Sequence, residues 1–213
     1  MKRITGSVSA LRTMSILLLV ALGIAPNARA AVVDCHREAA ALRESLEVVA
    51  EATIDGRSAD VPPAAGRATT WWKAHGRGFG SRPQAGTQIQ AMAASARRGD
   101  AKDAARQAVL LATASFDWCK GARRTDDELM LLDLVGMTAW LRARGTNMNW
   151  PARAQQTTQS LVTQLTARKN TSLASQLREA VTAAMASPVR ANGDAKPAIR
   201  LLDLVDVAEK ALR

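Results

Sequence analysis

Small and apolar residues recur at spacings of three and four positions along most of the chain, which is the period of an α-helix with one buried face. In residues 32–53 this stripe consists of Cys35, Ala39, Leu42, Leu46, Val49 and Thr53. Further stripes follow within residues 87–98, 100–120, 125–144, 151–184 and 198–212. The pattern predicts an all-α protein, a single-domain bundle of about five to seven helices formed by residues 31–213.

Capping residues mark several helix ends. Gly99 and Asp100 predict a tight turn between two antiparallel helices, because glycine ends a helix and aspartate caps the next one. Residues 125–128, Thr-Asp-Asp-Glu, match a capping box with the threonine as N-cap. Pro151 predicts the first turn of another helix, and residues 170–172 predict a break.

Residues 54–86 are the least regular part of the sequence. They contain Pro62, Pro63 and six glycines, and both residue types favour turns over long helices. We therefore predict an irregular crossover segment over residues 54–86, interrupted by a short helix around Trp71.

The first thirty residues have the layout of a secretory signal peptide. A basic start is followed by an apolar run over residues 16–25 and by Ala-Arg-Ala at residues 28–30. We predict cleavage after Ala30 and export to the periplasm. Removing residues 1–30 takes away four basic residues and no acid, which lowers the formal charge from +10 to +6.

Cys35 and Cys119 are the only cysteines, and an exported protein meets an oxidising compartment. We predict that they form a structural disulfide, because the chain has no C-x-x-C redox spacing. The bond would join the start of the first predicted helix to the end of the helix over residues 100–120. These two helices must then run antiparallel, and residues 54–86 must cross over between them.

Composition narrows the classes of protein. The hydrophobic fraction of 47% is too high for a disordered chain, and the aromatic fraction of 3% with no tyrosine disfavours a β-sandwich or barrel. The acids of residues 126–128 fit a helix N-terminus better than a catalytic cluster. Asp133 is the exception within an apolar helix, and if buried it needs an arginine or a hydrogen-bond partner.

A basic, aromatic segment is the strongest candidate for an interaction surface. Residues 67–82 contain no acid, and their candidate contact residues are Trp71, Trp72, Lys73, His75, Arg77, Phe79 and Arg82. Aromatic rings and arginines are typical anchors for a protein partner, and an anionic membrane surface is a second possibility. Nucleic acid is disfavoured for an exported protein. A competing interpretation is that the tryptophans cover the core while the cations are solvated.

These observations favour an exported, non-catalytic binding protein, an accessory, adaptor or inhibitor-like partner of another envelope protein. The sequence has no catalytic motif, no metal-binding motif and no cofactor motif, and only two histidines. The alternative is a periplasmic carrier that holds a ligand or metal in the bundle interior. The methionines that would recruit Cu(I) in that case are Met92, Met130, Met137, Met148 and Met185. The oligomeric state stays open.

Overall fold

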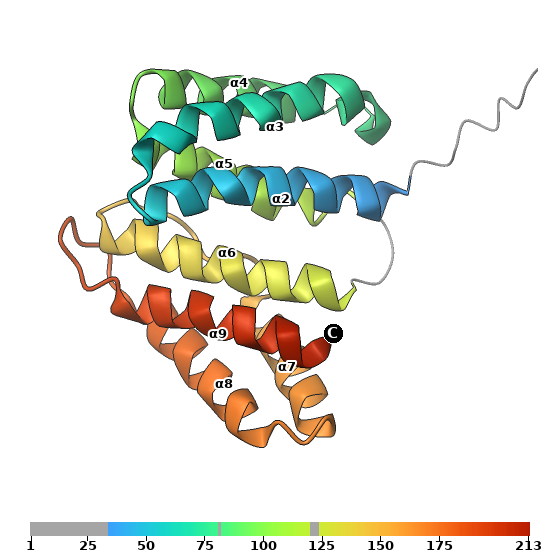
Figure 1. The fold of residues 1–213 in the computed structure, drawn as a ribbon, viewed down its shortest axis with the longest axis vertical. Helices are drawn as coiled ribbons and strands as arrows, with labels where there is room; N and C mark the ends of the chain where they lie inside the picture. Colours follow the sequence, from blue (N-terminus) through green and yellow to red (C-terminus); the bar gives the residue numbers. More distant parts are fainter. Residues whose placement is uncertain (1–33, 81, 120–123) are drawn as a thin grey trace, which may run out of the picture. The chain divides into compact units, whose positions relative to one another are not determined.

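The computed structural model describes residues 34–80, 82–119 and 124–213, so the predicted signal peptide lies outside the described residues. Within these ranges the chain forms eight α-helices and no strand (Figure 1). The helices are α2 (Cys35–Ile54), α3 (Val61–His75), α4 (Pro83–Arg97), α5 (Ala101–Ser115), α6 (Thr125–Ala143), α7 (Ala154–Ala167), α8 (Thr171–Met185) and α9 (Lys196–Leu212). The all-α prediction is confirmed, while the predicted number of helices is too low. None of these helices has the length and hydropathy needed to cross a bilayer.

The first four helices are neighbours in space, with α2 against α3 and α5, and α4 against the same two helices (Figure 1). The predicted disulfide is present: Cys35 and Cys119 are bonded, with their Cα atoms 5.7 Å apart. At the opposite end of the pair, the hydroxyl of Thr53 donates to the carbonyl of Ala101 over 3.2 Å. Helices α2 and α5 therefore run antiparallel.

The predicted irregular crossover over residues 54–86 is wrong for most of its length. The short turns Ser58–Asp60 and Gly76–Phe79 flank α3, a helix of 15 residues. Pro62 and Pro63 lie in the first turn of α3, where a missing N–H costs nothing. The buried side chains of α3 are small: Val61, Ala64, Ala65 and Ala68. This additional helix reverses the chain once more, so α2 and α5 become antiparallel without a crossover.

The turn at Gly99 and Asp100 is confirmed. Gly99 has a φ of +77°, which glycine adopts without strain, and the Asp100 carboxylate accepts from the N–H of Asp103. Burial would raise the pKa of Asp103, but hydrogen bonds from Ser95, Arg106 and Gln107 outweigh this effect and lower it. The sequence therefore located both the turn and its cap.

The remaining helices pack around α6, which contacts α5, α7, α8 and α9 (Figure 1). The break predicted at residues 170–172 lies slightly earlier in the chain, over residues 168–170, and separates α7 from α8. Two predicted helix starts need correction. Thr125 is the first residue of α6 rather than its N-cap; it is the Asp127 carboxylate that accepts from the backbone N–H of Arg124. Helix α7 begins at Ala154, three residues after Pro151.

Candidate functional site

The structure divides the predicted aromatic surface into a packed part and an exposed part. Phe79 is 8% exposed and contacts the rings of Trp72 and Trp118, with ring centroids 6.1 and 5.2 Å away. Arg82 donates to the carbonyl oxygens of Phe79 and Trp118. Trp72 leaves no space for a side chain at Gly76, where a Cβ would lie 2.6 Å from the indole ring. Through these contacts the end of α3 and the turn that follows it pack against Trp118, in the segment that follows α5.

Three polar residues among the predicted contact residues of the segment 67–82 are exposed to solvent. Lys73, His75 and Arg77 are exposed, and Trp71 is half-buried and stacks on the imidazole of His75 with centroids 4.7 Å apart. Trp71 and Trp72 both pack against the hydrophobic core. The seven predicted residues therefore lie close together. Trp72, Phe79 and Arg82, however, make contacts within the protein, so they are not fully available to a partner.

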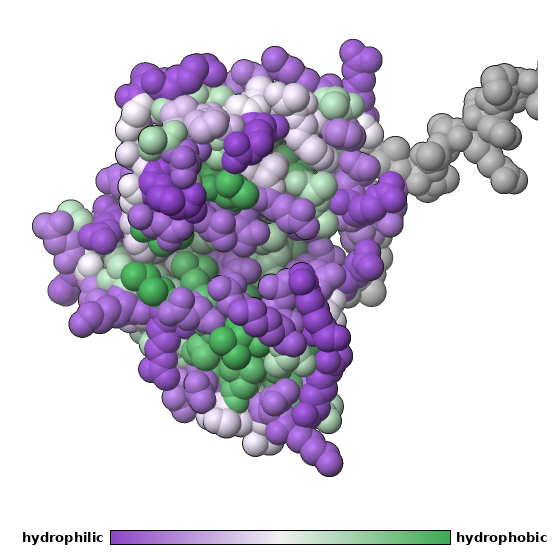
Figure 2. Space-filling model, viewed as in Figure 1, coloured by the Kyte–Doolittle hydropathy of each residue, from purple (hydrophilic) through white to green (hydrophobic). Residues whose placement is uncertain are grey.

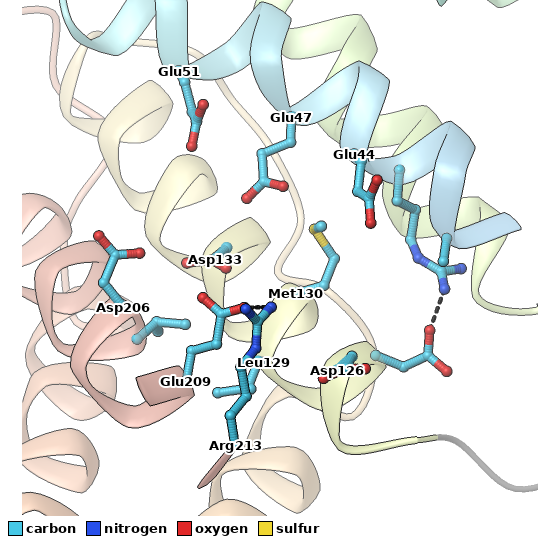
Figure 3. Close-up of a pocket in the computed structure, with 14 residues that line it drawn as sticks. Glu44, Glu47, Glu51, Asp126, Leu129, Met130, Asp133, Asp206, Glu209 and Arg213 are labelled. Atoms are coloured by element: carbon cyan, nitrogen blue, oxygen red, sulfur yellow. Dashed lines mark hydrogen bonds and ion pairs between the residues drawn. The ribbon is translucent and has the colours of Figure 1, made fainter. Parts of the chain in front are cut away.

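A second feature, which the sequence did not reveal, is a groove bounded by α2, α6 and α9. It consists of two adjoining cavities of about 350 and about 340 Å³, which share Glu47, Glu51, Asp133 and Asp206. Figure 3 shows the carboxylates of Glu47 and Glu51 reaching down from α2, with Asp133 on α6 beneath them and Asp206 approaching from α9. We call this feature the acidic groove.

The acidic groove concentrates negative charge in a basic protein. Its lining contains ten of the 19 carboxylates of a chain whose formal charge is +10. They are Glu44, Glu47, Glu51, Asp55, Asp126, Asp127, Asp133, Asp203, Asp206 and Glu209. Among the residues that the structure describes, two cationic side chains, Arg43 and Arg213, line the same walls. The groove is therefore the natural place for a positively charged ligand.

Both arginines are already paired with groove acids. The guanidinium of Arg43 is buried and donates to the carboxylate of Asp127, also buried, and lies 4.2 Å from the centroid of the Phe116 ring. Arg213 pairs with Glu209, as the dashed line in Figure 3 shows. The carboxylates deeper in the groove are left facing one another.

Asp133 lies at the floor of the groove, and no hydrogen bond or ion pair reaches its carboxylate from the described residues (Figure 3). Burial, reinforced by the charges of Glu47, Asp206, Glu51 and Glu209, raises the pKa of Asp133 well above its usual range. The arginine or hydrogen-bond partner that the sequence predicts for a buried Asp133 is not found among the described residues.

Two groove acids on α2 are perturbed in the same direction. Burial, together with the charges of Glu51, Glu44, Glu209 and Asp206, raises the pKa of Glu47 from 4.5 to about 8. Burial also raises the pKa of Glu51, assisted by Asp55 and Asp206 and opposed by Arg57. A cation placed among these groups would lower all three pKa values and release protons.

Part of the acidic groove is recognisable in the sequence. Glu44, Glu47 and Glu51 are spaced by three and four residues and so share one face of α2. Asp203 and Asp206 are three residues apart on α9, and both are exposed. What the sequence did not show is that these two faces meet over Asp133.

Among the described residues, no group of three or more His, Cys, Asp or Glu side chains is arranged to hold a metal ion. The three α2 carboxylates extend along the helix for about 10 Å, at 1.5 Å per residue. No family model, curated protein or solved structure matches the chain.

Proposed function

We propose that this is an exported, non-catalytic binding protein whose helical bundle binds a ligand with several positive charges in the acidic groove. The observation that carries the proposal is Asp133, a carboxylate at the floor of an open groove that has no partner in the described part of the chain. An unpaired carboxylate in this position destabilises the folded protein. A ligand that supplies the missing cation offsets that cost.

The shape of the charge distribution defines the ligand further. Glu44, Glu47 and Glu51 form a row along α2, and Asp206 and Glu209 form a second row on α9. Rows of charge match cationic groups spaced along a chain, as in a polyamine or a basic peptide, better than a single point charge.

Isothermal titration calorimetry with spermine and with penta-lysine tests this proposal on the mature protein. Asp133→Asn should weaken binding at least tenfold at pH 8, because the variant removes the carboxylate with which the bound cation pairs and keeps the shape of the side chain. Glu179→Gln is the matched control, since Glu179 is an exposed acid on α8 away from the groove. Its affinity should equal that of the wild type.

Proton release on ligand binding provides a second, independent test of the proposed function. Titrations in buffers of different ionisation enthalpy should show protons leaving the protein when the polycation binds, and affinity should rise between pH 6 and pH 9 as Glu47 ionises. Absence of binding to both ligands, or equal affinity of Asp133→Asn and the wild type, would contradict the proposal.

The basic aromatic segment supports a second proposal, contact with an envelope protein. The observation that favours it is the half-buried ring of Trp71 beside the exposed cations Lys73 and Arg77. A photo-crosslinking amino acid at Arg77 in the native host should give a discrete adduct that Trp71→Ala removes. The same probe at the exposed Lys102 on α5 serves as the control. Equal adducts at both positions would count against this surface.

A further inference from the structure

The acidic groove is lined by apolar side chains as well as by carboxylates. Its second cavity has an apolar wall formed by Ile54 of α2, Met137 of α6, and Ile199 and Leu202 of α9. Four carboxylates belong to both cavities, so the apolar wall and the acidic floor are parts of one continuous groove. Figure 2 shows hydrophobic surface among hydrophilic surface on the face of the molecule where α2, α6 and α9 lie.

Ile199 is the most exposed residue of this wall. Its side chain is 45% exposed, whereas Ile54 and Leu202 are half-buried and Met137 is buried. Ile199 and Leu202 lie one turn apart, and Asp203 and Asp206 follow on the same helix. On α2 the acidic residue comes first, since Glu51 precedes Ile54, but an acidic and an apolar side chain are again one turn apart. Each wall of the groove thus presents apolar and acidic side chains side by side.

We propose that the ligand of the acidic groove is a basic amphipathic peptide segment. Its lysines or arginines would lie over Asp133 and the neighbouring carboxylates, and its apolar side chains would lie against Ile199 and Leu202. This inference rests on the proposed function and narrows it from polycations in general to a peptide with an apolar face. Charge complementarity selects this occupant, because the groove repels nucleic acids and anionic lipid surfaces.

The length of the groove is compatible with such a segment. Glu44 and Glu51 are separated by seven residues, or about 10 Å of helix, which matches two turns of a bound helix or about three residues of an extended strand. A helix bound in a groove presents anchors at spacings of three and four. The same spacing separates the acids of α2.

Two peptides of equal charge test the inference by fluorescence anisotropy on the mature protein. The first is a labelled twelve-residue peptide with lysine and leucine on opposite faces of a helix, and the second has every leucine replaced by serine. We expect the leucine peptide to bind at least tenfold more tightly. Ile199→Ser should remove most of this preference, and Ile199→Leu should keep it.

Val207→Ser is the matched control, because Val207 is an apolar residue of the same helix, 48% exposed, that does not line the groove. Circular dichroism before and after urea verifies that each variant is folded. Equal binding of the two peptides would overturn the inference and leave the proposed function intact. A preference for leucine that Ile199→Ser and Val207→Ser affect equally would also overturn it. Failure of both peptides to bind would overturn the proposed function itself.

Discussion

Glu47 allows the cost of the acidic groove to be measured directly. Its pKa rises from 4.5 to about 8 in the folded protein, so the folded state retains a proton that the unfolded chain has released. The stability associated with this group is therefore fully present below pH 4.5 and is lost as pH rises through about 8. The free energy of unfolding should therefore decrease as the pH rises and Glu47 ionises in the groove.

The size of the effect follows from the shift. Each pKa unit corresponds to about 1.4 kcal/mol, so a shift from 4.5 to about 8 costs the folded state about 3 kcal/mol at pH 7 and up to about 5 kcal/mol above pH 9. Glu47→Gln removes the titrating group and keeps its shape. The variant should equal the wild type at pH 4 and become more stable than it by these amounts at higher pH.

Urea unfolding followed by circular dichroism at pH 4, 7 and 9 checks this prediction, with the disulfide left intact. Glu179→Gln is again the control, because an exposed glutamate on α8 should change stability by less than about 0.5 kcal/mol at every pH. Parallel pH profiles for Glu47→Gln and the wild type would refute the argument. A variant that gains stability and loses affinity for spermine at pH 9 would show that the acids serve binding at the expense of folding.

Other contacts yield further predictions. Cys35→Ser opens a loop with a sequence separation of 84 residues and should lower the unfolding free energy by about 4 to 5 kcal/mol in urea titrations. Arg43→Ala leaves the buried Asp127 without its cation and should cost about 3 to 5 kcal/mol by the same measurement, whereas Arg43→Met with Asp127→Leu should recover most of the loss. In thermal unfolding, Gly145→Ala should cost about 2 kcal/mol or more, because φ is +83° and its Cβ would lie 3.0 Å from a neighbouring backbone atom, while Gly66→Ala in open space should be neutral or stabilising by up to about 1 kcal/mol. Unchanged transitions in Cys35→Ser, Arg43→Ala or Gly145→Ala, or a loss of stability in Gly66→Ala, would contradict the corresponding argument.

The disulfide and the helix boundaries show how far sequence reasoning reaches. Cys35 and Cys119 were paired from redox compartment and position alone, and the antiparallel relation of their helices followed from the length of a helix. The prediction fell short for residues 61–75, where prolines and glycines indicated irregular chain with only a short helix around Trp71, whereas the structure has a helix of 15 residues. Small side chains at helical spacing were the overlooked signal, because alanines provide a close-packing face with little hydrophobicity.

The two candidate sites differ in how far they can be recognised from the sequence. The aromatic segment is continuous in the chain, so its residues can be recognised from the sequence alone, although the packing of Trp72 and Phe79 is visible only in the structure. The acidic groove combines three segments more than 60 residues apart in the chain, counting from Glu47 to Asp133 to Asp206. No local pattern joins them.

The sequence by itself determined the helical fold class, the positions of most helix ends and the cysteine pair. These properties depend on local spacing, on capping and on a pair of residues with no alternative partner. Only the tertiary structure decided that Asp133 faces other carboxylates instead of an arginine, and that Ile199 borders them. The physical reason is that the environment of a side chain, and hence its pKa and its available partners, depends on which helix faces are packed together.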